Sequence, residues 1–169
     1  MVLIVVAYII LLFNPDHSLL DRYEKQSHNS INKHLSIDSY QLERQDFSSG
    51  ELYQIQFDNQ TKAYLLLAEV AACNLGGCHR FEKSSKNGSF EYFDLMVITD
   101  ESKNILSVEI LDYFSEYGYQ ITSKKYLKKF INKNVCAFSH ELDGIDAISG
   151  ATISSYALED MLGLLCSVN

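Results

Sequence analysis

Residues 91–113 read EYFDLMVITDESKNILSVEILDY, and this stretch decides the fold class. Its two halves, residues 91–99 and 104–113, carry β-branched and aromatic side chains in partial alternation, which is typical of strands. The polar residues 100–103 between them form a linker of the length that joins a hairpin. An apolar run at residues 63–72 precedes this pair and predicts a further strand.

Two shorter segments follow the predicted hairpin. Residues 115–121 read SEYGYQI, an aromatic segment interrupted by Gly118, and residues 124–130 read KKYLKKF. The second segment predicts a helix with Tyr126, Leu127 and Phe130 on one side. The lysines of this helix form the one basic cluster of the chain, which is most simply its solvated face: Lys124, Lys125, Lys128 and Lys129.

Residues 146–155, DAISGATISS, contain a turn signal directly before a C-terminal helix. Ser149 or Thr152 is placed to cap this helix, which we expect to span residues 152–165. Its apolar residues recur at intervals of three and four, which predicts a buried face formed by Ile153, Ala157, Met161, Leu164 and Leu165. Because the first turn of a helix has unpaired N–H groups, the segment fits either an ordinary helix start or a phosphate-binding site.

The pattern Asp-x-x-Ser-Gly-Ala-Thr at residues 146–152 resembles the flavinylation motif of FMN-binding domains. These domains occur in the C subunit of the sodium-pumping NADH:quinone oxidoreductase, in the G subunit of the Rnf complex and in small exported flavoproteins. The resemblance covers roughly residues 90–165, and more weakly the region from residue 52. Relatives often carry a glutamate beside the glycine equivalent to Gly118, where this chain has Ser115 and Gln120 and where the only acid is Glu116.

The resemblance implies a fold, a cofactor and a set of site residues. The fold is α+β, a small antiparallel sheet flanked by helices, and the cofactor is FMN. A flavin transferase that recognises Asp146 would join the FMN phosphate to Thr152 through a phosphoester. The residues expected around the cofactor are Ser149, Gly150, Ala151 and Ser154 at the phosphate, and Tyr117 and Gly118 at the flavin ring.

Composition narrows the classes of function. The 169 residues suffice for one domain, and a net charge of −8 argues against a nucleic-acid partner. The chain contains none of the Gly-x-Ser-x-Gly, Walker, His-Glu-x-x-His or Gly-x-Gly-x-x-Gly patterns. We therefore predict no catalytic side chain and no metal site, and expect the chemistry to lie in the cofactor.

The N-terminal residues 2–13, VLIVVAYIILLF, form an unbroken apolar run. Twelve residues are fewer than a membrane span needs but match the core of a secretory signal, although a positive flank and an Ala-x-Ala site are missing. A buried strand or helix is the alternative. We expect an exported or membrane-anchored protein with a signal or anchor at residues 1–16, a helical lead-in at 17–50 and the FMN-binding domain at 51–169, its core at 90–166.

The four cysteines divide into two groups. Cys73 and Cys78 enclose a Gly-Gly turn and are followed by His79. They fit a structural disulfide, a redox-active dithiol, a c-type haem attachment site, a zinc site or free thiols. Cys136 and Cys166 are expected to be small buried apolar residues.

These observations predict an FMN-binding electron-transfer flavoprotein, either a carrier or a reductase component outside the cytoplasm, with a membrane or extracytosolic redox partner. Two alternatives are a non-catalytic binding or assembly module that has lost its flavin, and a thiol–disulfide redox protein that uses Cys73 and Cys78.

Overall fold

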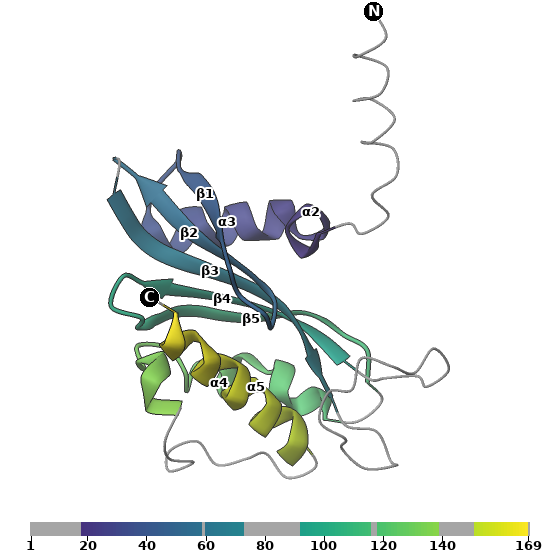
Figure 1. Ribbon diagram of the computed structural model, residues 1–169. Coiled ribbons are helices and arrows are strands. Elements are labelled where there is room, and N and C mark those ends of the chain that lie inside the picture. Colours follow the sequence, from purple (N-terminus) through teal and green to yellow (C-terminus); the bar gives the residue numbers. More distant parts are fainter. Residues whose placement is uncertain (1–17, 59, 73–91, 116–117, 139–150, 169) are drawn as a thin grey trace, which may run out of the picture.

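A five-stranded antiparallel sheet forms the centre of the molecule (Figure 1). The computed structural model describes residues 18–58, 60–72, 92–115, 118–138 and 151–168. The strands lie in the order of the chain and are β1 (Gln41–Gln45), β2 (Glu51–Phe57), β3 (Gln60–Ala71), β4 (Tyr92–Asp100) and β5 (Ile105–Tyr113). The expected α+β fold, a small antiparallel sheet flanked by helices, is confirmed.

The hairpin predicted from residues 91–113 is present as β4 and β5. The two strands pair antiparallel from Phe93 opposite Tyr113 to Thr99 opposite Ile105. Lys103 in the turn between them has a positive φ of 64°. The predicted strand at residues 63–72 corresponds to most of β3, which pairs with both β2 and β4.

Alternate residues of the sheet face two apolar cores. Phe93, Leu95 and Val97 of β4 face the C-terminal part of the chain, whereas Met96 and Ile98 face the N-terminal helices. Helices α2 (Leu19–Arg22) and α3 (Glu24–Leu35) cover the second face. The first face is covered by five elements: η1 (Tyr119–Thr122), α4 (Lys124–Leu127), η2 (Val135–Phe138), α5 (Thr152–Leu164) and η3 (Leu165–Ser167).

The N-terminal helices are joined to the sheet by polar contacts that are partly or fully buried. The backbone N–H groups of Leu19 and Leu20 donate to the Glu51 carboxylate at 2.8 and 3.1 Å. Asp94 of β4 is 1% exposed and accepts hydrogen bonds from the Tyr23 hydroxyl and, at 3.2 Å, from Arg22 Nη1. Burial, followed by the hydrogen bond to Asp94, raises the pKa of Tyr23 to about 12. The lead-in is therefore packed onto the domain.

Part of this lead-in is not helical. Residues 41–45, inside the range predicted as a helical lead-in, form β1 and pair with β2 from Gln41 opposite Gln56 to Gln45 opposite Leu52. The strand is polar and lies at the edge of the sheet, so its sequence carries no apolar alternation that would have indicated a strand.

Several predicted features fall on residues outside the described ranges. They are the signal or anchor at residues 1–16 and the Cys73–Cys78 segment with His79. Within residues 18–168, as far as they are described, no helix is both long and apolar enough to cross a membrane.

Candidate functional site

Helix α5 begins at Thr152, the residue expected to carry the cofactor. The N-cap residue is Ala151, which forms no side-chain cap, and the first turn contains no acidic residue. The prediction that Thr152 caps the helix is therefore wrong, because Thr152 is the first residue inside it. Its side chain is exposed at the end of the helix where N–H groups lack intrahelical partners and an anion is stabilised. Asp146, Ser149 and Gly150 lie outside the described residues.

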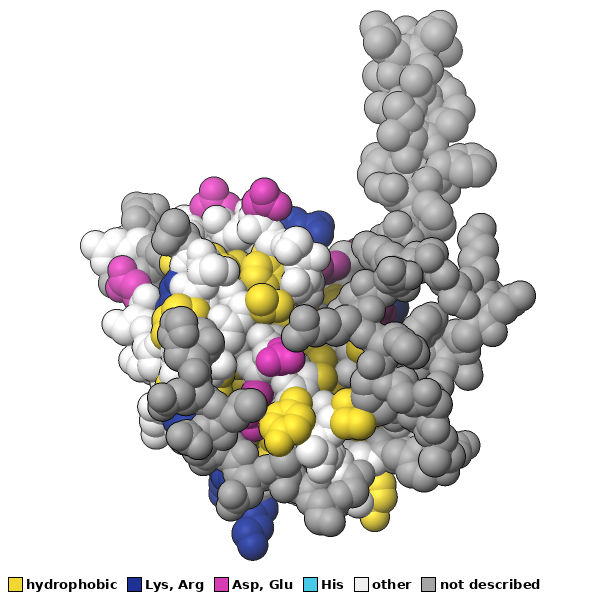
Figure 2. All heavy atoms as spheres, turned by 60° about the horizontal axis from the view of Figure 1, so that its bottom comes forward, with side chains coloured by type: hydrophobic (Ala, Val, Ile, Leu, Met, Phe, Trp, Pro, Cys, Tyr) yellow, Lys and Arg dark blue, Asp and Glu magenta, His cyan; other side chains and the backbone are white. Residues whose placement is uncertain are grey.

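The face of α5 that packs on the sheet differs from the face predicted by apolar spacing. Ile153 and Leu164 are 44% and 45% exposed, although Met161 and Leu165 are buried as expected. The buried face instead includes three polar residues, Ser154, Ser155 and Glu159. Figure 2, which turns the underside of Figure 1 toward the reader, shows apolar side chains at the surface on this side of the molecule.

Hydrogen bonds explain why serines are buried there. The Ser155 hydroxyl donates to the Ala151 carbonyl oxygen one turn earlier, at 2.9 Å, which is a common way for a helical serine to satisfy its hydroxyl. Ser154 Oγ lies 3.1 Å from the Tyr113 hydroxyl at the end of β5, and the two form a hydrogen bond. Small side chains also let the start of α5 approach the end of the hairpin closely.

Gly118 packs against this hydrogen bond. Its φ of +81° is in the left-handed region that favours glycine. A Cβ atom at this position would lie 2.7 Å from the Tyr113 hydroxyl, 2.9 Å from Ser154 Oγ and 3.6 Å from Ala151 Cα. Three residues expected to share the site, Gly118, Ala151 and Ser154, are thus brought together from distant parts of the sequence.

Sequence reasoning missed Tyr113 in this cluster. It named Tyr117, which lies outside the described residues, as the aromatic neighbour of the flavin. The feature of the sequence that could have indicated Tyr113 is its position at the end of the second hairpin strand. In the structure it pairs with Phe93, and the two rings stack at a centroid distance of 5.9 Å. A side chain at the end of a strand that faces the core is placed to reach the helix that covers the same face.

Gln120 adds an unused hydrogen-bond acceptor near Gly118. Its Oε1 atom is buried and finds no donor among the residues that the structure describes. Tyr119, between these two residues, is 64% exposed. Phe114, the residue after Tyr113, is also exposed and stacks on Tyr92 at 4.5 Å. This end of the sheet therefore presents an open aromatic surface beside a buried acceptor.

Glu159 lies two turns further along α5 and is buried against the core. Burial raises the pKa of its carboxyl, the nearby Asp160 raises it further, and Lys133 lowers it. Its Oε1 atom has no hydrogen-bond partner within the described ranges. Burial likewise raises the pKa of Tyr126, whose hydroxyl faces the same part of the core. These groups lie under the helix rather than at its exposed start.

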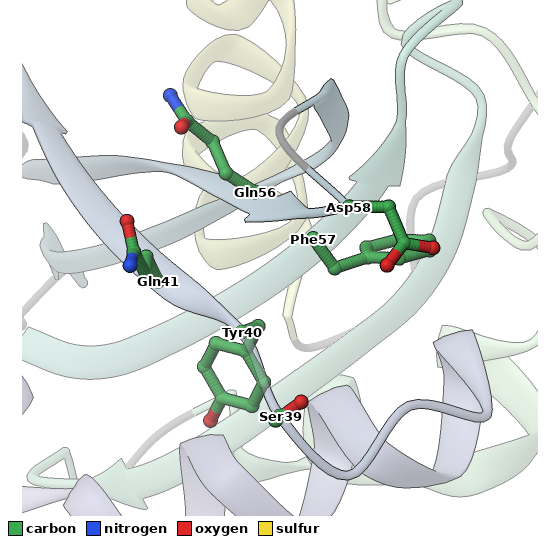
Figure 3. A pocket seen from close by; sticks show the side chains of 6 residues that line it. All are labelled: Ser39, Tyr40, Gln41, Gln56, Phe57 and Asp58. Atoms are coloured by element: carbon green, nitrogen blue, oxygen red, sulfur yellow. The ribbon is translucent and has the colours of Figure 1, made fainter.

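A hollow of about 250 Å³ lies elsewhere, on β1 and β2 (Figure 3). It is lined by Ser39, Tyr40, Gln41, Gln56, Phe57 and Asp58. None of the residues that the sequence singled out lines it, and none of its lining residues belongs to α5 or its neighbours. The hollow is separate from the cluster around Gly118.

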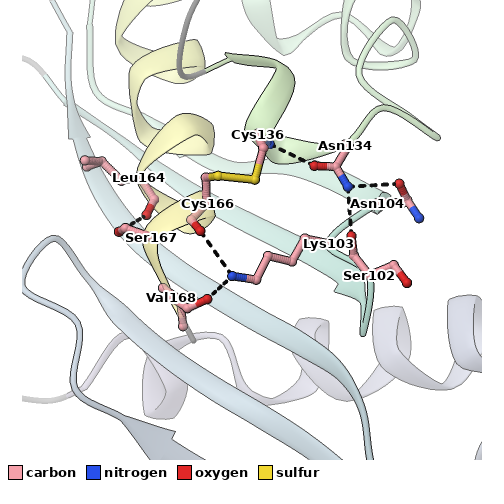
Figure 4. Close-up of a disulfide and its surroundings, with 9 residues drawn as sticks. All are labelled: Ser102, Lys103, Asn104, Asn134, Cys136, Leu164, Cys166, Ser167 and Val168. Atoms are coloured by element: carbon pink, nitrogen blue, oxygen red, sulfur yellow. Dashed lines mark hydrogen bonds between the residues drawn. A yellow bond between two sulfur atoms is a disulfide. The ribbon is translucent and has the colours of Figure 1, made fainter.

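A disulfide closes the part of the chain that carries the motif (Figure 4). Cys136 of η2 and Cys166 of η3 are bonded, with an S–S distance of 2.07 Å and a sequence separation of 30 residues. The expectation that they are small buried apolar residues is therefore wrong, because the two are half-buried and bonded to each other. Spacing along the chain could not indicate the pairing, because it depends on η2 packing beside the end of α5.

Polar contacts hold the same end of α5 against the β4–β5 turn. Lys103 Nζ donates to the Cys166 carbonyl oxygen at 3.3 Å and to that of Val168. Asn134 donates to the Ser102 carbonyl oxygen at 2.8 Å and accepts from the Cys136 N–H at 3.0 Å. Both ends of α5 are thus fixed to the hairpin, the first through Ser154 and the last through Lys103.

A comparison with known families found one match. Residues 92–164 match the model of the FMN-binding domain. This part of the chain is similar to FMN-binding domains. The match runs from the first residue of β4 to the last residue of α5, so it includes Tyr113, Gly118, Thr152 and Ser154. No curated protein matches the chain.

FMN is the cofactor that the match indicates, and the described residues of the matched segment fit it. An exposed hydroxyl at the start of α5 and a first turn without acids suit a phosphate group. Gly118 keeps side-chain bulk out of its contact with Ala151 and Ser154. The buried Gln120 Oε1 and the exposed Tyr119 supply an acceptor and an apolar surface, the two kinds of group that a flavin ring needs.

Proposed function

We propose that this protein carries FMN joined through its phosphate to the Thr152 hydroxyl and transfers electrons outside the cytoplasm, as a carrier or a reductase component. The observation that carries the proposal is the exposed Thr152 at the first position of α5, beside the contact between Gly118 and Ser154. An attachment enzyme needs a hydroxyl that it can reach, and Thr152 offers one at a helix N-terminus.

The domain's own residues would hold and orient the cofactor. The first-turn N–H groups of α5 and the small residues beside them would receive the phosphate, and Asp146 would be read by the flavin transferase. The hydrogen bond between Tyr113 and Ser154 fixes the start of α5 to β5, and Gly118 packs on that bond. The redox chemistry itself would be supplied by FMN.

Two observations support a location outside the cytoplasm. The Cys136–Cys166 disulfide is a bond that persists in oxidising compartments and is rare in the cytosol. The apolar run at residues 2–13 has the length of a secretory signal core. Covalent attachment also suits such a location, since a dissociable flavin would be lost by dilution.

The test is to produce the protein together with a flavin transferase, load it with FMN and follow its electron exchange anaerobically. We expect flavin absorbance that survives acid denaturation, is bleached by reductant and returns when an acceptor is added. Thr152→Val should lose the acid-stable flavin. Thr122→Val, at another exposed threonine, should keep it.

Two outcomes would contradict the proposal. Acid-stable flavin retained by Thr152→Val would place the attachment elsewhere. Flavin bound at Thr152 that does not cycle between its oxidised and reduced forms would remove the electron-transfer role.

A further inference from the structure

We propose that Lys124, Lys125, Lys128 and Lys129, here called the lysine patch, form the docking surface for an acidic electron-transfer protein. This inference rests on the proposed function, because it places the redox partner beside the flavin-bearing end of α5. It assigns a role to a basic cluster that sequence analysis explained as a solvated helix face.

The charge of the lysine patch is opposite to that of the chain as a whole. The ten residues from 124 to 133 contain five of the fourteen Lys and Arg residues and no Asp or Glu, whereas the chain has a net charge of −8. All four patch lysines are exposed. In the part of the chain that the structure describes, the ion pairs involve Arg22, and none involves a patch lysine. The patch is therefore a positive surface on a negative protein.

The inner side of the patch segment is packed into the core. The residues on the inner side of this segment, Tyr126, Leu127 and Phe130, are buried in the core that also receives α5. The Tyr126 and Phe130 rings meet edge to face at 5.3 Å, and Lys129 Nζ lies 5.6 Å from the centre of the Tyr126 ring. Because the inner side is fixed, the lysines are held outward together.

The patch lies close to the candidate flavin site. Gly118, which contacts Ala151 and Ser154, directly precedes η1, and Lys124 follows η1 after Ser123. Six residues cover at most about 22 Å even when fully extended, and four of those between Gly118 and Lys124 form the compact helix η1. A protein bound to the patch would thus lie next to the start of α5. Figure 2 shows Lys and Arg side chains at the lower edge of the same side of the molecule, near exposed apolar side chains.

The position of the patch favours a protein over a lipid surface. The described chain begins at Ser18, next to α2, and α2 is fixed to the sheet face opposite the one that carries α4 and α5 (Figure 1). Residues 14–17 can span at most about 14 Å. If the apolar run at residues 2–13 anchors the protein, the bilayer lies on the α2 side of the sheet, and the patch faces the other way.

Redox partners exchange electrons through small, transient interfaces. Complementary charge on the two surfaces raises the rate of encounter by about 10-fold or more. A strongly negative partner would be attracted to the patch and repelled by the rest of the chain. The same four lysines would orient the partner on this surface and raise its rate of association.

The experiment uses an acidic two-iron ferredoxin as the probe. Reduced ferredoxin, which gives up one electron per molecule, is mixed with FMN-loaded protein in a stopped-flow instrument, and bleaching of the flavin absorbance is followed at low and at physiological ionic strength. The patch variant is K124Q/K125Q. The matched control is K25Q/K33Q, which removes two exposed lysines from α3 on the opposite face.

We expect K124Q/K125Q to slow the second-order rate about three- to tenfold at low ionic strength, with a smaller effect at physiological ionic strength. K25Q/K33Q should change the rate less than about twofold. Reduction by a small neutral reductant should be unchanged in both variants. Equal effects of the two variants, or none from K124Q/K125Q, would overturn the proposal.

Two further arms separate the possible failures. Ferredoxin binding is also measured on protein produced without the transferase, and K124Q/K125Q should weaken binding there as well. If the protein never takes up FMN, the proposed function fails, but this measurement still tests the lysine patch. Binding to vesicles of phosphatidylglycerol and phosphatidylcholine is compared for wild type and K124Q/K125Q. Vesicle binding that depends on these lysines would show that the patch is a lipid surface.

Discussion

Replacing Cys136 and Cys166 together by serine opens a covalent loop of 30 residues that contains all of α5 and the motif before it. In the chain-entropy account, a cross-link that closes a loop of this size raises the free energy of unfolding by about 3.6 kcal/mol. Its removal should lower the free energy of unfolding by the same amount. Lys103 still holds the end of α5 through the Cys166 and Val168 carbonyl oxygens. The folded structure should therefore persist, and most of the loss should come from the unfolded chain.

The measurement is urea unfolding of the wild type and the double serine variant under non-oxidising handling, followed by circular dichroism. A loss of about 3.6 kcal/mol corresponds to a fall in melting temperature of roughly 7–14 °C for a domain of this size. Wild type treated with reductant serves as the control and should show the same loss. Peptide mapping without reduction should recover Cys136 joined to Cys166. A loss below about 1 kcal/mol, or a cross-link between other cysteines, would refute the reasoning.

Three other perturbations test the packing around the site. Gly118→Ala should destabilise the domain by about 1–3 kcal/mol in urea unfolding, because its φ is positive and the new Cβ overlaps two hydroxyl groups; an unchanged midpoint would contradict the contact described. Asp94→Ala should cost roughly 2–3 kcal/mol by leaving the buried Tyr23 hydroxyl without its acceptor, whereas Glu69→Ala, at an exposed carboxylate, should cost less than about 1 kcal/mol. Glu159→Gln should raise the free energy of unfolding at neutral pH but not at acid pH. Because the pKa of Glu159 is raised in the folded protein, its ionisation lowers stability as the pH rises above the ordinary pKa of a glutamate. Equal effects of the substitution at both pH values would contradict this.

The hairpin could be predicted because its signal is local. β4 and β5 carry strand-forming residues on both sides of a short polar turn, and that pattern needs no information from the rest of the chain. The segment around Gly118 and the helix after Ala151 could also be singled out, although only folding shows that they touch.

Features that depend on tertiary contacts were not accessible in this way. The buried face of α5 was predicted from apolar spacing, yet Ser154 is buried because Tyr113, 41 residues earlier, supplies a hydrogen-bond partner. Polar β1 gains its strand structure from pairing with β2 at the sheet edge. The Cys136–Cys166 bond follows from the packing of η2 beside α5, which no spacing rule contains.

The central claim is that Thr152 carries FMN, and the mass of the intact protein tests it most directly. Protein produced together with a flavin transferase should be heavier than its sequence by the mass of FMN minus water, about 438 Da, and fragmentation should place the addition on Thr152. Thr152→Val should show no addition. An unmodified wild type, or an addition that Thr152→Val retains, would contradict the account.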